Sequence, residues 1–194
     1  MEAQKRGANQ IELCSRLDLD GLTPIIGDIE QCLDQLNIHL KVMIRPIAGH
    51  FILSNATKEL MLQEIDVMKE VGVKEVVFGA TTEEARLNID HISIFRDRAF
   101  PMKVCIHKAI DTCSDLLYET DELIRIGGIK SILTSGGSDT AKQGAMIIKE
   151  MIVLCQDEIQ VIPAGRITNH NLLEIDQTIG ASIYHGRKIL GSLV

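Results

Sequence analysis

A short β-rich apolar run followed by a longer amphipathic run recurs about every thirty residues along the chain. Strands that alternate with helices form parallel sheets, because each helix returns the chain to the start of the next strand. Polar or reactive residues stand where the predicted strands end: Glu12, Cys14, Arg45, His107, Ser135, Arg166 and His185. In closed parallel barrels the site lies at the carboxyl ends of the strands, so the pattern predicts a TIM-type (β/α)8 barrel with a site at that mouth.

Seven strands are predicted from the β-rich runs. They cover residues 10–14, 40–45, 75–79, 103–107, 131–134, 160–163 and 182–185. The first segment, EAQKRGA, is typical of a helix with a glycine stop and follows no strand, so we expect the first strand of the barrel to be missing. The 194 residues are also fewer than the about 250 of most such barrels. No linker divides the chain, and one domain over residues 1–194, incomplete at its start, is expected.

Composition excludes several classes of partner. The net charge is −7, the basic residues form no run, and there is no Trp, which argues against nucleic acid. No apolar run approaches the roughly 18 residues of a membrane span, and the first residues do not form a signal peptide. The five cysteines contain no C-x-x-C pair, which argues against disulfides and structural zinc. We therefore expect a reducing compartment, the cytoplasm, with the nucleus as an alternative.

Strand alternation predicts which side chains share a face. Glu12 and Cys14 point to one side of their strand, as do Cys105 and His107 of theirs. Both faces of a barrel strand are covered, so the charged Glu12 and Arg45 need partners. They lie on neighbouring predicted strands. We expect them to neutralise each other or to orient the carboxylate of a substrate.

The order of seven short motifs resembles one known family. The motifs are GANQIELC, DGLTPIIG, VMIRP with Phe51 after it, VVFGATTE, IHKAID, ILTSGGSD and AGRIT. Over about residues 7–185 they resemble the CutC family of copper homeostasis proteins. The resemblance implies a TIM barrel, a cytoplasmic setting and a role in binding Cu(I). Family members begin with an additional strand carrying Glu-x-Cys, whose cysteine would be the natural partner of Cys14.

Two cysteines are the candidate metal ligands, Cys14 and Cys105, because a soft thiolate suits Cu(I). Either could instead be a small buried apolar residue. His107 is a candidate general base or metal ligand with an equally good structural interpretation. Asp111 most simply caps the next helix, with acid-base catalysis as the alternative. With Glu12 and Arg45, His107 and Asp111 form the candidate catalytic set.

Glycines and cations after the last strands suggest an anion site. Glycine N–H groups and basic side chains there could bind phosphate, as in many barrels; these residues are Gly136, Gly137, Gly165, Arg166, Arg187 and Lys188. Copper homeostasis through Cu(I) binding is the leading functional hypothesis. The alternatives are an enzyme acting on a small anionic or phosphorylated metabolite, and a non-catalytic scaffold. A barrel with exposed strand edges would favour pairing with another chain, so a homo-oligomer is a further hypothesis.

Overall fold

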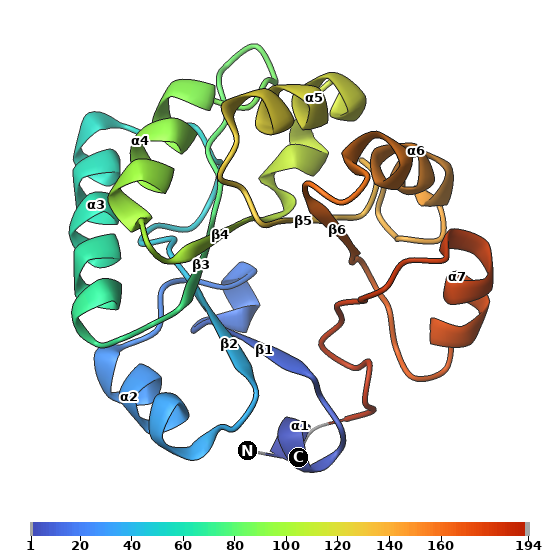
Figure 1. Ribbon diagram of the computed structural model, residues 1–194, viewed down its shortest axis with the longest axis horizontal. Coiled ribbons are helices and arrows are strands. Elements are labelled where there is room, and N and C mark those ends of the chain that lie inside the picture. Colours follow the sequence, from blue (N-terminus) through green and yellow to red (C-terminus); the bar gives the residue numbers. More distant parts are fainter. Residues whose placement is uncertain (1, 193–194) are drawn as a thin grey trace.

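The computed structural model describes residues 2–192. Its centre is a six-stranded parallel sheet in which the strands follow one another in sequence order. The strands are β1 (Gln10–Leu13), β2 (His39–Met43), β3 (Glu75–Phe78), β4 (Lys103–Ile106), β5 (Ser131–Thr134) and β6 (Gln160–Pro163). The sheet curls into an incomplete barrel, as Figure 1 shows, so the prediction of a TIM-type α/β fold is confirmed.

Helices surround the curled sheet on its outer side (Figure 1). The α-helices are α1 (Glu2–Lys5), α2 (Ile26–Gln35), α3 (Asn55–Glu70), α4 (Ile89–Ala99), α5 (Leu116–Ile126), α6 (Ala145–Cys155) and α7 (Leu172–Ile179). Two short 3-10 helices follow β1 and β4, namely η1 (Leu17–Leu19) and η2 (Lys108–Thr112). Within residues 2–192 no helix has the length and apolar character needed to cross a membrane.

Local sequence explains where the helices begin. The Ser54 hydroxyl accepts a hydrogen bond from the N–H of Thr57 at 3.1 Å and starts α3. Asp115 accepts one from the N–H of Tyr118 at 3.0 Å and starts α5. The interpretation of Asp111 as the cap of that helix is therefore wrong, because Asp111 lies four residues earlier, inside η2.

The two faces of the sheet carry separate cores. On the outer face, alternate strand residues such as Val42, Val76 and Phe78 pack against the helices in the large core. The other residues point into the barrel, where the inner cluster consists of Met43, Val77, Cys105, Leu133, Ile162 and Ala164. This alternation is the pleat of a β-strand with both sides covered. It decides which polar side chains can reach the interior.

The prediction of a seventh strand at residues 182–185 is wrong. The segment lies beside β6 and keeps one parallel-type hydrogen bond, from the N–H of His185 to the carbonyl of Pro163 at 2.9 Å. Among the described residues, no strand pairs with the side of segment 182–185 that faces away from β6. Strand β1 pairs only with β2 within the same residues. A single bond does not hold the backbone in a regular ladder. The sheet is therefore open between β1 and this segment, and the predicted domain of residues 1–194 is described only from 2 to 192.

This opening leads to a prediction about backbone protection. Amide hydrogens of residues 181–186 should exchange at least about tenfold faster than those of β5 and β6, because one ladder bond protects them. Hydrogen exchange followed by mass spectrometry at neutral pH would measure the difference. Equal protection of the two regions would mean that the segment is held as firmly as a central strand.

Candidate functional site

The inner floor is a polar group at the amino-terminal end of the strands, formed by the buried Lys41, Glu75 and Ser131 and the half-buried His39. Lys41 Nζ lies 2.9 Å from Glu75 Oε1 and donates to Ser131 Oγ at 3.3 Å. His39 Nε2 lies 2.6 Å from the other carboxylate oxygen. Burial alone would raise the pKa of Glu75, but its bonds to Lys41 and His39 prevail and the pKa is lowered. The carboxylate is therefore ionised and paired.

Sequence reasoning missed this inner floor. Lys41 is 5% exposed and Glu75 is 2% exposed, so both charges are inside the protein. Their positions in the sequence could have indicated it. Lys41 stands two residues before Met43 and Glu75 stands two residues before Val77, so each shares the inner face of its strand with an apolar residue.

Arg45 follows β2 at the carboxyl-terminal mouth of the sheet. Its side chain forms hydrogen bonds to the loops after β1 and β2. Its Nη1 donates to the carbonyls of Leu19 and Gly21, both at 2.9 Å, and its Nη2 donates to the carbonyl of Gly49 at 3.0 Å. Its Cζ stands 5.1 Å from the ring centre of Phe51, a cation-π arrangement. The guanidinium is thus used mainly to hold the loops after β1 and β2.

The predicted pairing of Glu12 with Arg45 is wrong. Glu12 is in register with Lys41, which places it two pleat repeats deeper than Arg45. Among the described residues, the guanidinium of Arg45 forms no ion pair. All three predicted residues Glu12, Arg45 and His107 belong to the inner side of the sheet, but only Arg45 and His107 meet at the mouth, through Phe51.

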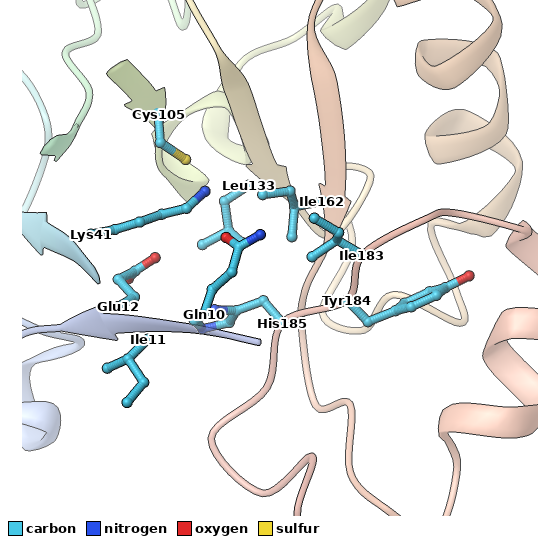
Figure 2. Close-up of a pocket in the computed structure, with 10 residues that line it drawn as sticks. All are labelled: Gln10, Ile11, Glu12, Lys41, Cys105, Leu133, Ile162, Ile183, Tyr184 and His185. Atoms are coloured by element: carbon cyan, nitrogen blue, oxygen red, sulfur yellow. The ribbon is translucent and has the colours of Figure 1, made fainter. Parts of the chain in front are cut away.

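Glu12 lines a cavity of about 60 Å³ that extends from the inner floor to the opening beside β1. Figure 2 shows Glu12 and Lys41 reaching into this space from neighbouring strands. The lining residues are Gln10, Ile11, Glu12, Lys41, Cys105, Leu133, Ile162, Ile183, Tyr184 and His185. The cavity is large enough for water-sized molecules.

His107 is buried at the mouth in a defined protonation state. Its Nδ1 accepts a hydrogen bond from the N–H of Ala109 at 3.1 Å, so the neutral ring carries its proton on Nε2. Burial, with a smaller contribution from the charge of Arg45, lowers its pKa to about 4. Its ring centre is 4.9 Å from that of Phe51. At neutral pH it is an uncharged donor facing the mouth.

Gly79 makes room for this imidazole. A Cβ atom at residue 79 would lie 2.7 Å from both Cε1 and Nδ1 of His107 and 2.9 Å from the Cβ of Ala109. Contacts that short do not occur between real side chains, so the end of β3 has to be a glycine while the ring keeps this position.

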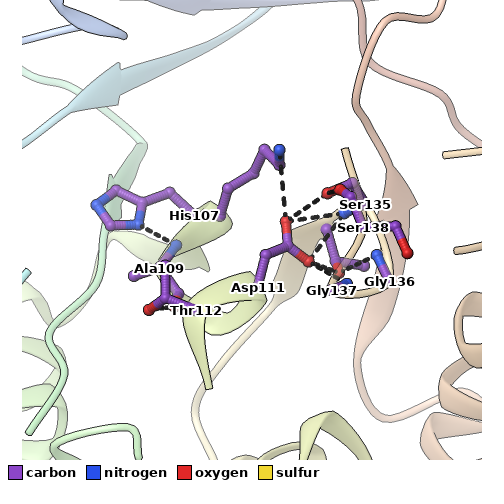
Figure 3. Close-up of polar contacts among 10 residues, drawn as sticks. His107, Ala109, Asp111, Thr112, Ser135, Gly136, Gly137 and Ser138 are labelled. Carbon is purple, nitrogen blue, oxygen red and sulfur yellow. Dashed lines mark hydrogen bonds and ion pairs between the residues drawn. The ribbon is translucent and has the colours of Figure 1, made fainter. Parts of the chain in front are cut away.

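Asp111 organises the loop after β5 (Figure 3). It accepts hydrogen bonds from the hydroxyl of Thr134 at 2.5 Å, the hydroxyl of Ser135 at 2.9 Å and the N–H of Gly137 at 3.0 Å. The N–H of Ser135 also donates to both of its oxygens, and the N–H of Gly136 donates to Thr134 Oγ1. The N–H groups expected to bind an anion at Gly136 and Gly137 therefore already have partners inside the protein.

The remaining predicted anion-site cations lie on two adjacent loops. An isolated bridge between Thr168 and Lys188 joins the loop after β6 to the loop after His185. Arg166, Arg187 and Lys188 are all exposed, and within residues 2–192 only Arg187 of the three has an ion pair, to Asp20 at 3.4 Å. Gly165 approaches the loop after β5 closely, since a Cβ there would lie 2.9 Å from the Cβ of Ser135. These groups present a positive surface at the mouth.

The two predicted metal ligands have different surroundings. Cys105 is 1% exposed in the inner cluster, and burial raises the pKa of its thiol to about 12. Cys14 is half-buried, and burial followed by the charge of Glu12 raises its pKa to about 11. Cys14 Sγ and Met43 Cε lie 3.2 and 3.9 Å from the point that a Cβ on Gly21 would occupy, so their side chains are neighbours.

No His, Cys, Asp or Glu side chains in residues 2–192 are grouped in threes or more in a way that could hold a metal ion. A three-coordinate site for a soft metal among these residues would thus need sulfur from methionine as well as cysteine.

Similarity to known proteins extends over nearly the whole chain. The model of the CutC family matches residues 1–190. The chain belongs to the CutC family. The copper homeostasis protein cutC homolog of Homo sapiens is 34% identical over 185 residues, which cover 95% of this chain and 67% of the human protein. The family protein CutC of Photobacterium profundum is 34% identical over 183 residues, or 94% and 74% of the two chains.

A solved CutC structure shares the fold. It is the putative copper homeostasis protein CutC from Streptococcus agalactiae, with a TM-score of 0.87 and 26% identity. The match covers 93% of this chain and 89% of that one. The resemblance to the CutC family expected from the motifs is therefore confirmed.

The state of His107 leads to a prediction about stability and pH. Its pKa is about 4 in the folded protein and about 6.5 in an unfolded chain, so the unfolded state binds more protons between these values. Stability should fall as the pH drops from about 6.5 to about 4, with up to about 3 kcal/mol due to this residue. Urea unfolding at several pH values should show a shallower fall for His107→Gln than for the parent protein.

The exposed His170 supplies a control for the loss of a histidine, because His170→Gln removes no side-chain hydrogen bond among the described residues. Parallel pH curves for the parent and His107→Gln would contradict the assignment of a buried neutral ring.

Proposed function

We propose that this CutC family member acts in copper homeostasis by binding Cu(I) with the sulfur atoms of Cys14, Met43 and Cys105. The observation that carries the proposal is that Met43 and Cys105 belong to the inner cluster of the sheet and that the half-buried Cys14 packs against it. Thiolates and thioethers are the ligands that select Cu(I). The human relative is named for copper homeostasis, which agrees with this choice of ion.

The proposed site releases protons when it binds the ion. Both thiols are protonated at neutral pH, because their pKa values are raised to about 11 and about 12. Cu(I) displaces a proton from each cysteine that it binds, whereas the thioether of Met43 has no proton to lose. All five cysteines are free thiols, so a reducing compartment, the cytoplasm, suits the proposal.

This mechanism leads to a prediction for copper affinity. Between pH 6 and pH 9 the affinity for Cu(I) should rise about tenfold per pH unit for each thiol that ionises on binding. Competition with a Cu(I) chelator under anaerobic conditions would measure it. Cys14→Ser should weaken binding by about a hundredfold and Met43→Leu by about tenfold, because each removes a soft ligand.

Cys32 on α2 is the matched control, since it is a half-buried free cysteine outside the inner cluster. Cys32→Ser should bind Cu(I) like the parent protein. Affinity that is unchanged by Cys14→Ser, or independent of pH, would show that the ligands lie elsewhere.

A second function is favoured by the positive surface at the mouth. Arg166, Arg187 and Lys188 project from adjacent loops, and the Arg45 Nε inside the mouth is a buried donor without a partner among the described residues. Together with the neutral His107, these groups suit a small anionic or phosphorylated molecule. In an enzyme, the neutral His107 would donate a hydrogen bond from Nε2 to an oxygen of such a molecule and keep its proton.

Inorganic phosphate would test this second function. We expect weak millimolar binding in calorimetry or NMR titration, reduced about tenfold by Lys188→Gln and by Arg166→Gln, because each removes a cation. Lys74→Gln, an exposed charge at the opposite end of β3, is the control. Binding that responds equally to all three substitutions would reflect general charge and not a site.

A further inference from the structure

Lys41 is a primary amine inside the protein that a small molecule can reach. It is 5% exposed, and with Glu12 it lines the cavity of about 60 Å³ that extends to the opening beside β1. Within residues 2–192 its ammonium group has two polar partners, Glu75 Oε1 at 2.9 Å and Ser131 Oγ at 3.3 Å. An ammonium group has three donors, so one N–H is left for a molecule in the cavity.

A chain of hydrogen bonds connects this amine to solvent. Glu75 accepts from Lys41 on Oε1, and its Oε2 lies 2.6 Å from His39 Nε2. Glu75 is buried, whereas the side chain of His39 is 32% exposed. A lysine has to lose a proton before its nitrogen can attack another molecule, and this relay provides the route for that proton.

Glu12 stands beside the amine on the neighbouring strand. Glu12 and Lys41 are in register between β1 and β2, and Figure 2 shows both side chains extending into the cavity. Among the described residues, the carboxyl group of Glu12 forms no ion pair. It is therefore free to carry protons to and from a molecule bound next to Lys41.

The cavity selects a ligand by size and charge. Its volume of about 60 Å³ holds a few water-sized molecules, so a compound of one or two carbon atoms fits. Lys41 and Glu75 balance each other, which leaves the charge of Glu12 to repel an anion. An amine with a proton route and a second acid-base group suits condensation with a carbonyl compound.

We propose that this cavity is a further reactive site, in which Lys41 forms an imine with a small uncharged aldehyde. Lys41 first gives one proton to Glu75. Its nitrogen lone pair then forms a bond to the carbonyl carbon, and one electron pair of the C=O bond moves to the oxygen. Glu12 transfers a proton from the nitrogen to that oxygen, which becomes a hydroxyl group.

The remaining steps release water. The proton that left through Glu75 and His39 is replaced from solvent through Glu12, and the protonated hydroxyl group leaves as water while the nitrogen lone pair forms the C=N bond. The ammonium group and the aldehyde have then become a protonated imine and one water molecule. Because the protonated imine keeps the positive charge, Glu75 stays paired after the reaction.

Reductive trapping tests the proposal. Acetaldehyde with cyanoborohydride at neutral pH converts an imine into a stable N-ethyl group, and peptide mass spectrometry identifies the modified lysines. Lys41 should react at least about tenfold faster than the exposed Lys74, and its rate should saturate with aldehyde concentration, because the aldehyde binds first. The anionic glyoxylate should modify Lys41 at least about tenfold more slowly than acetaldehyde does.

Substitution of Glu12 tests its part in the reaction. Glu12→Gln keeps the shape of the side chain but carries no proton, so it should slow trapping at Lys41 about a hundredfold and leave Lys74 unchanged. Glu64→Gln is the matched control, since Glu64 is a partly buried carboxyl group outside the cavity. Circular dichroism would confirm that both variants fold.

Three results would overturn the proposal. Modification of Lys41 no faster than that of Lys74 would show that the cavity does not activate the amine. A rate at Lys41 that rises linearly with aldehyde concentration would exclude a binding step. Equal rates in the parent protein and Glu12→Gln would exclude the proposed transfer of protons by Glu12.

Discussion

The buried ion pair between Lys41 and Glu75 constrains the whole interior of the sheet. Two charges are tolerated there because they pair with each other, Lys41 also donates to Ser131 Oγ, and Glu75 is also bonded to Ser131 and His39. A shift of either strand by one residue would turn these charges outward into the large apolar core. The pair therefore fixes the register of β2 against β3. It also fixes which side of the sheet each later residue of these two strands points to.

From this floor the inner side chains rise in layers. Along β2 the sequence Lys41, Met43 and Arg45 passes from the ion pair to the sulfur-containing layer and then to the mouth, in steps of about 7 Å. On β4, Cys105 lies in the same layer as Met43, and His107 lies at the mouth with Arg45. The proposed soft-metal site and the proposed anion site would therefore lie at different depths of one barrel interior.

Strand periodicity predicts the six strands and the inward direction of Glu12, Arg45, Cys105 and His107, because these follow from the pleat alone. The partners of the polar residues could not be predicted in the same way. Arg45 binds three backbone carbonyls, and Asp111 binds the loop after β5, because loop conformation brings those groups within reach. The segment 182–185 has the composition of a strand, yet a regular strand requires neighbours on its edges.

The close approach of Gly79 to His107 has a consequence for how sequences of this kind can change. The imidazole at 107 excludes any side chain at 79, although the two residues are separated by a whole strand-helix unit. Replacement of the glycine should be accepted only after the histidine has become a smaller residue. Residues 79 and 107 should therefore vary together among relatives. A relative with a residue other than glycine at 79 should also lack the histidine at 107.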